Sequence, residues 1–289
     1  MRGLLGSRAQ DLSSDQTGGN LSVTSNPSNF RIDPSVAHSA RVWNYWLGGK
    51  DNYKIDRELA QELADAFPGI VDIARQVRHF LSRAIRYLVV EAGVRQFLDI
   101  GTGLPTANNT HEIAQGMVPQ ARIVYVDNDP LVLVHARALL TSCPEGATEY
   151  VEADVRDPDT ILREAAHTLD FTQPVALMML GVLGHIPDSD NPHTIVGRLL
   201  DSLPSGSYLV IDDGADIDPA YVGAVQDFSQ NPNSASPYYP RSREQITRFF
   251  DGLELVEPGV VSTSQWRPEP SIWGPPVEIS DYAGVGRKP

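Results

Sequence analysis

Short apolar segments alternate with longer segments of helical periodicity over residues 96–230, and this alternation limits the possible folds more than any other feature. The apolar segments predict strands over residues 96–100, 121–126, 148–152, 175–180 and 207–211. Helices are predicted over residues 106–116, 130–141, 158–168, 192–203 and 218–230. Strands that are apolar on both faces and separated by helices form a parallel sheet with helices on both sides. The sequence therefore predicts an α/β fold.

The regions on either side of this alternation differ from it and from each other. Residues 1–34 are rich in Ser, Gly, Asn and Thr and show no periodicity, so we expect a flexible leader. Residues 35–94 have helical periodicity broken at Gly48-Gly49 and Pro68-Gly69, which predicts an N-terminal helical cap. Residues 95–289 are expected to form the α/β domain. After its fifth strand, that domain is predicted to end with a helix and two strands, over residues 242–250, 253–256 and 282–285.

Composition argues against several classes of partner. The chain has 37 Asp and Glu against 23 Lys and Arg, a formal net charge of −14, and an acidic surface repels nucleic acids and anionic membranes. Its single cysteine, Cys143, cannot form an intrachain disulfide or a Cys-rich metal site, and the histidines lack metal-binding spacing. No apolar run reaches the roughly 18 residues of a membrane span. We expect a cytoplasmic protein without a metal; the oligomeric state is not predicted.

The first predicted strand leads into a glycine-rich turn with the sequence DIGTG. Glycines let the backbone turn sharply and approach a ligand closely, and the following helix presents its N-terminus. A dinucleotide fingerprint would have a third glycine where this chain has Thr106, which disfavours a nicotinamide cofactor. We expect Asp99, Gly101, Thr102 and Gly103 to bind a cofactor, and an ordinary tight turn is the alternative.

Acidic residues also follow the second and third predicted strands. Asp127, with Asn128 after it, ends the second strand, and an acid at this place can accept hydrogen bonds from both ribose hydroxyls. Asp154 and Val155 follow the third strand, where the Asp154 carboxylate could accept a hydrogen bond from the exocyclic amine of adenine, with the Val155 amide nearby. The alternative is a helix cap or a solvated turn carboxylate for Asp127, and a helix cap for Asp154. The carboxyl ends of parallel strands meet at one edge of the sheet, so these residues are expected to line one crevice.

Taken together, the glycine turn, the acid after the second strand and the Asp154-Val155 pair resemble the class I S-adenosylmethionine-dependent methyltransferases. The resemblance covers about residues 95–289. It implies a Rossmann-like sheet of seven strands in which the seventh is antiparallel and lies between the fifth and sixth. It also implies S-adenosyl-L-methionine as the cofactor, with Leu180 near its methionine end.

A second resemblance lies near the N-terminus. The segment ARVWNYWLGGKDNY, residues 40–53, is similar to the N-terminal signature of a bacterial family of methyltransferase-like proteins long labelled as a domain of unknown function. Residues 241–246, 255–259 and 266–268 are similar to the tail of the same family. This resemblance implies the same fold and cofactor but no particular substrate.

The same N-terminal segment combines aromatic and polar side chains around a Gly-Gly break. This composition favours a lid over the methionine half of the cofactor and over the acceptor. The lid or substrate residues would be Arg41, Asn44, Tyr45, Lys50 and Tyr53, and either cation could pair with the cofactor's carboxylate. An ordinary packing helix is the alternative.

Three further groups are weaker candidates. His185 lies after the fourth strand, where many methyltransferases of this class have two histidines, but Gly184 replaces the first; His185 is a candidate general base or a loop brace. Asp212-Asp213, after the fifth strand, favours a polar turn before a helix over a functional carboxylate pair. Tyr238-Tyr239 lies in a Pro-rich loop that could cover a substrate or simply pack.

These features predict an S-adenosylmethionine-dependent methyltransferase that acts on a small-molecule acceptor. The sulfonium already makes the methyl group electrophilic, so the protein needs mainly to align the acceptor with it, and a strong catalytic motif is not expected. The alternative is a protein that binds S-adenosylmethionine or S-adenosylhomocysteine without methyl transfer, as a sensor or interaction module, because such motifs indicate binding and not turnover.

Overall fold

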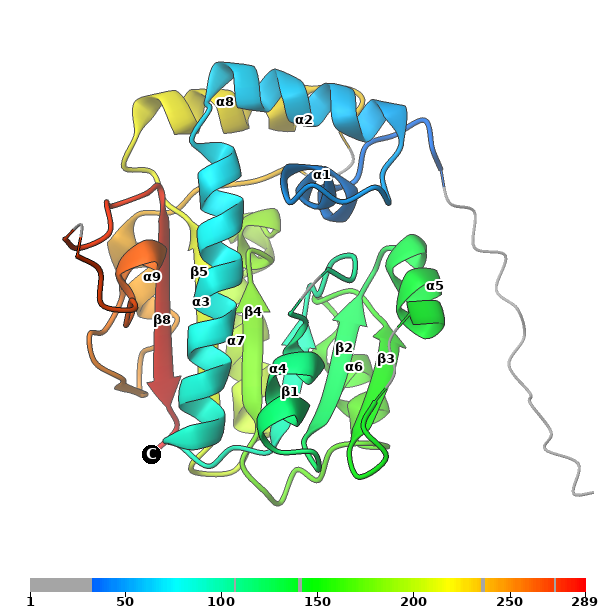
Figure 1. The fold of residues 1–289 in the computed structure, drawn as a ribbon, viewed down its shortest axis with the longest axis vertical. Helices are drawn as coiled ribbons and strands as arrows, with labels where there is room; N and C mark the ends of the chain where they lie inside the picture. The colour runs from blue at the N-terminus through cyan, green and yellow to red at the C-terminus, as the bar shows by residue number, and fades with distance from the viewer. Residues whose placement is uncertain (1–32, 107, 140–141, 235–236, 273) are drawn as a thin grey trace, which may run out of the picture. The chain divides into compact units, whose positions relative to one another are not determined.

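The computed structural model describes residues 33–106, 108–139, 142–234, 237–272 and 274–289 (Figure 1). Almost all of the predicted leader, residues 1–34, lies outside them. The described residues fall in one compact unit. No helix among them is long and apolar enough to cross a membrane.

A mixed β-sheet forms the centre of this unit, with the strand order β3-β2-β1-β4-β5-β8-β6 and with β7 beside β8. The strands are β1 (Gln96–Ile100), β2 (Arg122–Asp127), β3 (Ala147–Glu152), β4 (Ala176–Leu180), β5 (Tyr208–Gly214), β6 (Glu254–Leu255), β7 (Val261–Ser262) and β8 (Asp281–Arg287). β1 to β5 are parallel and β8 runs antiparallel to β5. The predicted α/β class, parallel strands and antiparallel seventh strand are thus confirmed. Within the described residues the sheet has eight strands, because the two-residue β7 adds to the expected seven.

Helices cover both faces of this sheet (Figure 1). They are α1 (Ser39–Trp46), α2 (Lys54–Ala66), α3 (Ile70–Val90), α4 (Thr110–Met117), α5 (Pro130–Leu139), α6 (Pro158–Ala165), α7 (Pro192–Asp201), α8 (Pro219–Gln230) and α9 (Arg243–Arg248). On the face covered by α3 and α4, Phe80 packs with Phe97 and Trp266. On the face covered by α6, α7 and α9, Leu98 packs with Leu199. Successive strand residues point to opposite faces, so a strand buried on both sides has to be apolar throughout.

One helix begins later than the periodicity predicts. The helix expected over residues 106–116 starts at Thr110 because Asn109 caps it. The backbone N–H of Asn109 donates to the Glu112 carboxylate at 2.7 Å, one half of a capping box. The preceding residues are thereby left as a loop beside the glycine turn.

The predicted cap region divides between two apolar clusters. α1, α2 and α8 lie beyond the carboxyl ends of the parallel strands (Figure 1). Val42 of α1, Leu59 of α2 and Val225 of α8 pack with Ala74 in the first half of α3. The second half of α3 packs on the sheet through Phe80. α3 therefore joins the helices above the strand ends to the sheet itself.

The strand order reverses between β1 and β4, which are neighbours although β2 and β3 separate them in the chain. Open α/β sheets bind ligands at the carboxyl ends of the strands beside such a switch point. The predicted site residues at the ends of β1, β2, β3 and β4 all lie at this edge.

Candidate active site

The turn after β1 has the backbone conformation that its two glycines allow. Gly101 has φ 75° and Gly103 has φ 68°, both in the left-handed region that favours glycine. The N–H of Gly101 donates to the carbonyl of Val126 at 2.8 Å, which holds the turn against β2. A Cβ on Gly101 would lie 2.7 Å from the side chain of Val182, whereas one on Gly103 would meet nothing within 4 Å. The first glycine is therefore required by close packing and the second borders open space.

Asp127, at the end of β2, is tied to this turn. Its Oδ2 accepts a hydrogen bond from the N–H of Gly103 at 2.8 Å, and its Oδ1 accepts one from the N–H of Asp129 at 2.9 Å. The carboxyl is buried, and the loss of solvation raises its pKa while the two amides act in the opposite direction. The structure thus brings two separately predicted site elements into direct contact.

Asp99, at the base of the turn, is also buried. Thr110, the first residue of α4, donates its hydroxyl to Asp99 Oδ2 at 2.6 Å. Burial raises the pKa of Asp99 to about 6, and the hydroxyl and the positive charge of Arg78 moderate that rise. Arg78, from α3, donates to the carbonyl of Asn108 at 2.7 Å. A carboxyl and a guanidinium therefore lie together beside the glycine turn.

The residues after β3 behave differently from one another. Val155 is buried, but the Asp154 side chain is 42% exposed and is bound by its neighbour Arg156. The Arg156 N–H donates to Asp154 Oδ1 at 2.8 Å, and the guanidinium also pairs with Asp190 at 3.0 Å. An adenine-binding role for Asp154 stays a prediction.

A cavity of about 440 Å³ lies between the strand ends and helices α1, α3 and α8. Cavities of this size hold small-molecule ligands. The predicted site residues that line it are Asn44, Asp99, Gly101, Thr102, Gly103, Asp127, Asn128, Val155, Leu180 and His185. The predicted site residues that the structure places outside its lining are Arg41, Tyr45, Lys50, Tyr53 and Asp154. Of the three acids expected to line one crevice, Asp99 and Asp127 border this cavity and Asp154 does not, and most of the lid candidates do not border it either.

His185 lies in the wall of this cavity with a defined proton position. Its Nδ1 is 2.9 Å from the carbonyl oxygen of Pro237. A carbonyl oxygen only accepts, so Nδ1 carries the hydrogen and Nε2 holds the lone pair. Burial lowers the pKa of His185 to about 4, and its ring packs edge-on against Tyr238. His185 is therefore neutral at neutral pH and a weak base.

Residues 25–289 match the family model described as S-adenosyl methyltransferase. The chain belongs to this family of S-adenosylmethionine-dependent methyltransferases. Its cofactor is S-adenosyl-L-methionine, and the protein is an enzyme. No curated protein matches the sequence.

Solved structures agree with this assignment. A DUF574-family protein from Streptomyces avermitilis is 45% identical with a TM-score of 0.85, over 90% of this chain and 100% of that one. A protein from Thermobifida fusca is 41% identical with a TM-score of 0.81, over 88% of this chain and 96% of that one. The plantazolicin methyltransferase BpumL, in complex with SAH, is 11% identical with a TM-score of 0.50, over 86% and 96% of the two chains. The last likeness concerns the fold alone.

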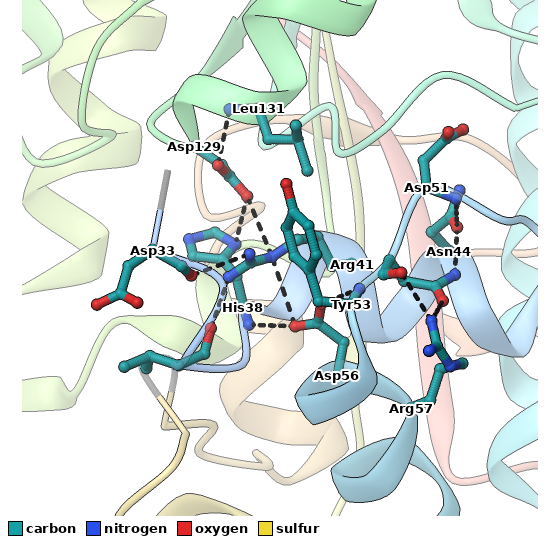
Figure 2. A network of polar contacts seen from close by, with 12 residues as sticks. Asp33, His38, Arg41, Asn44, Asp51, Tyr53, Asp56, Arg57, Asp129 and Leu131 are labelled. Carbon is teal, nitrogen blue, oxygen red and sulfur yellow. Dashed lines mark hydrogen bonds and ion pairs between the residues drawn. The ribbon is translucent and has the colours of Figure 1, made fainter. Parts of the chain in front are cut away.

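The two cations predicted for the methyltransferase's lid do not border the cavity. Arg41 is buried, and its Nε lies 3.4 Å from Oδ1 of Asp56, while Nη2 donates to the carbonyl of Val36 at 2.7 Å (Figure 2). The same Asp56 accepts from the N–H of His38 at 3.0 Å. Lys50 is exposed. Arg41 therefore holds α1 against α2.

The remaining lid candidates build the turn between α1 and α2. Asn44 accepts at Oδ1 from the N–H of Asp51 at 3.1 Å and from the side-chain amide of Asn52 at 2.8 Å (Figure 2). Tyr53 donates its backbone N–H to Asp56 at 2.7 Å, and the Tyr45 hydroxyl donates to Gln61 at 3.2 Å. Of the predicted lid or substrate residues, Asn44 alone lines the cavity among the described residues.

His38, which the sequence did not single out, connects the start of α1 to the residues after β2. It lines the cavity at the start of α1, and its Nδ1 lies 3.2 Å from Oδ2 of Asp129 (Figure 2). Asp129 in turn donates its N–H to Asp127. A line of polar contacts thus runs from the cap to the acid at the end of β2.

The interpretation of Asp212 and Asp213 as a polar turn is wrong, because both belong to β5 and are fully buried. β5 continues past Ile211 because β8 pairs with it over its whole length. Asp213 is neutralised by Arg241, whose Nη1 lies 3.1 Å from Oδ2, and it accepts a 2.5 Å hydrogen bond from the Tyr238 hydroxyl. Tyr238 therefore packs into the protein and also lines the cavity.

Asp212 points to the opposite face of β5 and lines the cavity. Asp281 of β8 shares that face, because it pairs with Gly214, two residues beyond Asp212. Thr263 donates its hydroxyl to Asp281, and burial raises the pKa of both acids. No sequence pattern pointed to Asp281 as a neighbour of Asp212, because only the alignment of β5 with β8 brings the two residues together.

Proposed function

We propose that this methyltransferase transfers the methyl group of S-adenosylmethionine to a small molecule bound in the same cavity. The observation that carries the proposal is the continuity of that cavity. It is lined both by the glycine turn with Asp127 and by the ends of β4 and β5. When bound, the cofactor supplies an electrophilic methyl group, and the protein positions the acceptor and excludes water.

The first two strand ends fit the adenosine half of the cofactor. Asp127 is held by two backbone amides and keeps acceptor capacity for the ribose hydroxyls, since each carboxylate oxygen has two lone pairs. The space beside Gly103 leaves room for the ligand. We assign Asn128 and Val155, which line the same end, to the walls around the base.

Two side chains of opposite charge fit the amino-acid half of the cofactor. Asp99 is suited to the ammonium group and Arg78 to the carboxylate, because both line the cavity beside the turn. Arg78 thus takes the role that the sequence suggested for Arg41 or Lys50. Leu180 lines the cavity between this end and β5.

We infer that residues 35–94 act as a cap on the domain formed by residues 95–289. His38 and Asn44 contribute to the cavity wall from the cap. His185, neutral with its Nε2 lone pair free of a proton, is suited to accepting a hydrogen bond from the acceptor rather than to removing a proton. The general base is not His185 in this account.

Calorimetric titration with S-adenosylmethionine, S-adenosylhomocysteine and NAD tests the proposal. Both sulfur compounds are expected to bind and NAD is not. A screen of small-molecule acceptors by mass spectrometry then follows the transfer of one methyl group. Binding of NAD alone would refute the cofactor site, and binding of S-adenosylhomocysteine without any transfer would favour a sensor or interaction module.

A further inference from the structure

Asp212 is a buried carboxylate that the protein leaves unsatisfied. Its side chain has no exposed area, and neither carboxylate oxygen has a hydrogen-bond partner among the described residues. Buried carboxylates are ordinarily paired or hydrogen-bonded, because desolvation without compensation is costly. Since Asp212 lines the cavity, a ligand there can supply the missing partner.

A second acid and a tyrosine lie close to Asp212. Asp281 is on the same face of the sheet and also lines the cavity. The Tyr221 side chain comes close to Gly214, the residue that pairs with Asp281, because a Cβ on that glycine would collide with the Tyr221 hydroxyl. Two carboxyls and a hydroxyl thus gather at one end of the cavity, and a cation is the partner that such a group favours.

No Lys or Arg in the described cavity lining pairs with Asp212. Of the Lys and Arg residues in the described cavity lining, Arg78 lies beside Asp99 and Arg156 is paired with Asp154 and Asp190. Arg241 pairs with Asp213 on the other face of β5. No Lys or Arg side chain of the described lining therefore pairs with Asp212.

The surroundings indicate what the rest of that molecule is like. Ile73 and Val77 of α3 and Val225 and Phe228 of α8 line the same cavity. α3 covers the face of the sheet to which Asp212 points, and its first half packs with α8. A charged group at the acids and an apolar body between the helices would match this lining.

We propose that the methyl acceptor is an aliphatic amine with an apolar body, whose ammonium group binds Asp212 and Asp281. This inference rests on the proposed function and names its substrate class. In the transfer, Asp212 takes one proton from the ammonium group, and the freed nitrogen lone pair forms the new bond to the methyl carbon. The carbon–sulfur bond breaks and its electron pair stays on sulfur, giving S-adenosylhomocysteine and a methylated ammonium product.

Matched ligands test this specificity without relying on turnover. We would measure thermal shifts and calorimetric binding on the full chain saturated with S-adenosylhomocysteine. The probes are triplets that share one body, with propyl, phenyl and indolyl bodies, such as 2-phenylethylamine, 2-phenylethanol and 3-phenylpropanoate. The amine of at least one triplet is expected to bind roughly tenfold more tightly than its alcohol, with no binding of the carboxylate.

Two variants and a control locate the effect. Asp212→Asn and Asp281→Asn should each reduce the preference for the amine roughly tenfold, whereas Asp216→Asn, at an exposed position in the next turn, should leave it unchanged. If Asp212→Asn does not fold, the preference for the amine in the wild type and its loss in Asp281→Asn still test the inference. Absence of amine preference in every triplet, including absence of binding, overturns the inference. Failure to bind S-adenosylhomocysteine refutes the proposed function instead.

Discussion

Asp127 and Asp212 occupy comparable places in the fold but have opposite surroundings. Each is a buried aspartate near the carboxyl end of a parallel strand, and each lines the same cavity. Asp127 accepts hydrogen bonds from the backbone of Gly103 and of Asp129, whereas Asp212 accepts none within the described part of the chain. The first carboxylate is positioned before any ligand arrives, and the second depends on one.

The difference follows from what lies beside each strand end. β2 ends next to a glycine turn, in which the N–H of Gly103 donates to the Asp127 side chain. β5 is flanked by β8, and the backbone N–H groups of paired strands are used in the ladder. A carboxylate on a strand that is paired on both sides, such as Asp212, therefore has no free backbone donor beside it.

The largest effect is expected at the turn that supports Asp127. Gly101→Val places a side chain where Val182 already lies, at a φ of 75° that β-branched residues avoid. The variant should lose detectable binding of S-adenosylhomocysteine in calorimetry. Gly197→Val, in helix α7 with nothing within 4 Å of its Cβ position, is the matched control and should bind normally. Retained affinity in a folded Gly101→Val variant would show that the turn does not cradle the cofactor.

Removal of the Asp127 carboxylate, which accepts two backbone hydrogen bonds, should have the next largest effect. Asp127→Ala deletes charge-assisted hydrogen bonds worth about 1.5–3 kcal/mol, so the affinity for S-adenosylhomocysteine should fall about ten- to a hundred-fold. Asp157→Ala removes an exposed acid that caps α6 and should leave that affinity unchanged. The assignment of Asp127 to the ribose fails if both variants bind equally well.

Arg78 tests the part of the cavity that we assign to the amino-acid portion of the cofactor. Arg78→Gln should weaken binding of S-adenosylhomocysteine roughly tenfold, through loss of one charge-assisted contact to its carboxylate. Binding of adenosine, which has no such carboxylate, should not change. The ratio of the two affinities, measured by calorimetry, separates this role from a general loss of packing, which would weaken both ligands alike.

The smallest effect concerns stability, and it is expected to differ between the two acids. Burial raises the pKa of Asp212 above its ordinary value of 3.8, so the folded state holds this proton to a higher pH than the unfolded chain. The contribution of Asp212 to stability therefore falls as the pH rises above about 4. Asp212→Asn removes that penalty and should raise the free energy of unfolding by about 1 kcal/mol at about pH 8, with little gain near pH 4.

Denaturant unfolding of wild type and variant at the two pH values measures this difference. Asp127→Asn is the matched comparison. Burial raises the pKa of Asp127 as well, but an Asn side chain has an acceptor oxygen for only one of the two backbone amides, so this variant should not gain stability at about pH 8. A loss of stability in Asp212→Asn at about pH 8 would mean that its carboxylate is satisfied in the free protein.

Much of the fold could be predicted because apolar periodicity reports it directly. β1 was predicted at its observed bounds, and β2 to β4 within one residue, because strands buried on both faces are apolar throughout. β5 extends to Gly214, beyond the predicted end, because its last residues are acidic and only pairing with β8 keeps them in the strand. Local sequence could not show that pairing.

Site residues in short turns after strands could be predicted from local sequence. Residues whose role depends on partners far away in the sequence were harder to predict. Gly101, Gly103 and Asp127 were predicted together and line the cavity together. Arg41 resembled a ligand cation, but its partner Asp56 lies on another helix, and no spacing rule links the two. Arg78, one of several polar residues on a long amphipathic helix, gave no signal of its own.

Titration of S-adenosylhomocysteine into wild type, Asp127→Ala and Asp212→Asn tests most directly the division of the cavity into a cofactor half and an acceptor half. We expect Asp127→Ala to lose affinity about ten- to a hundred-fold and Asp212→Asn to keep the wild-type value. Equal losses in both variants, or a greater loss in Asp212→Asn, would contradict it.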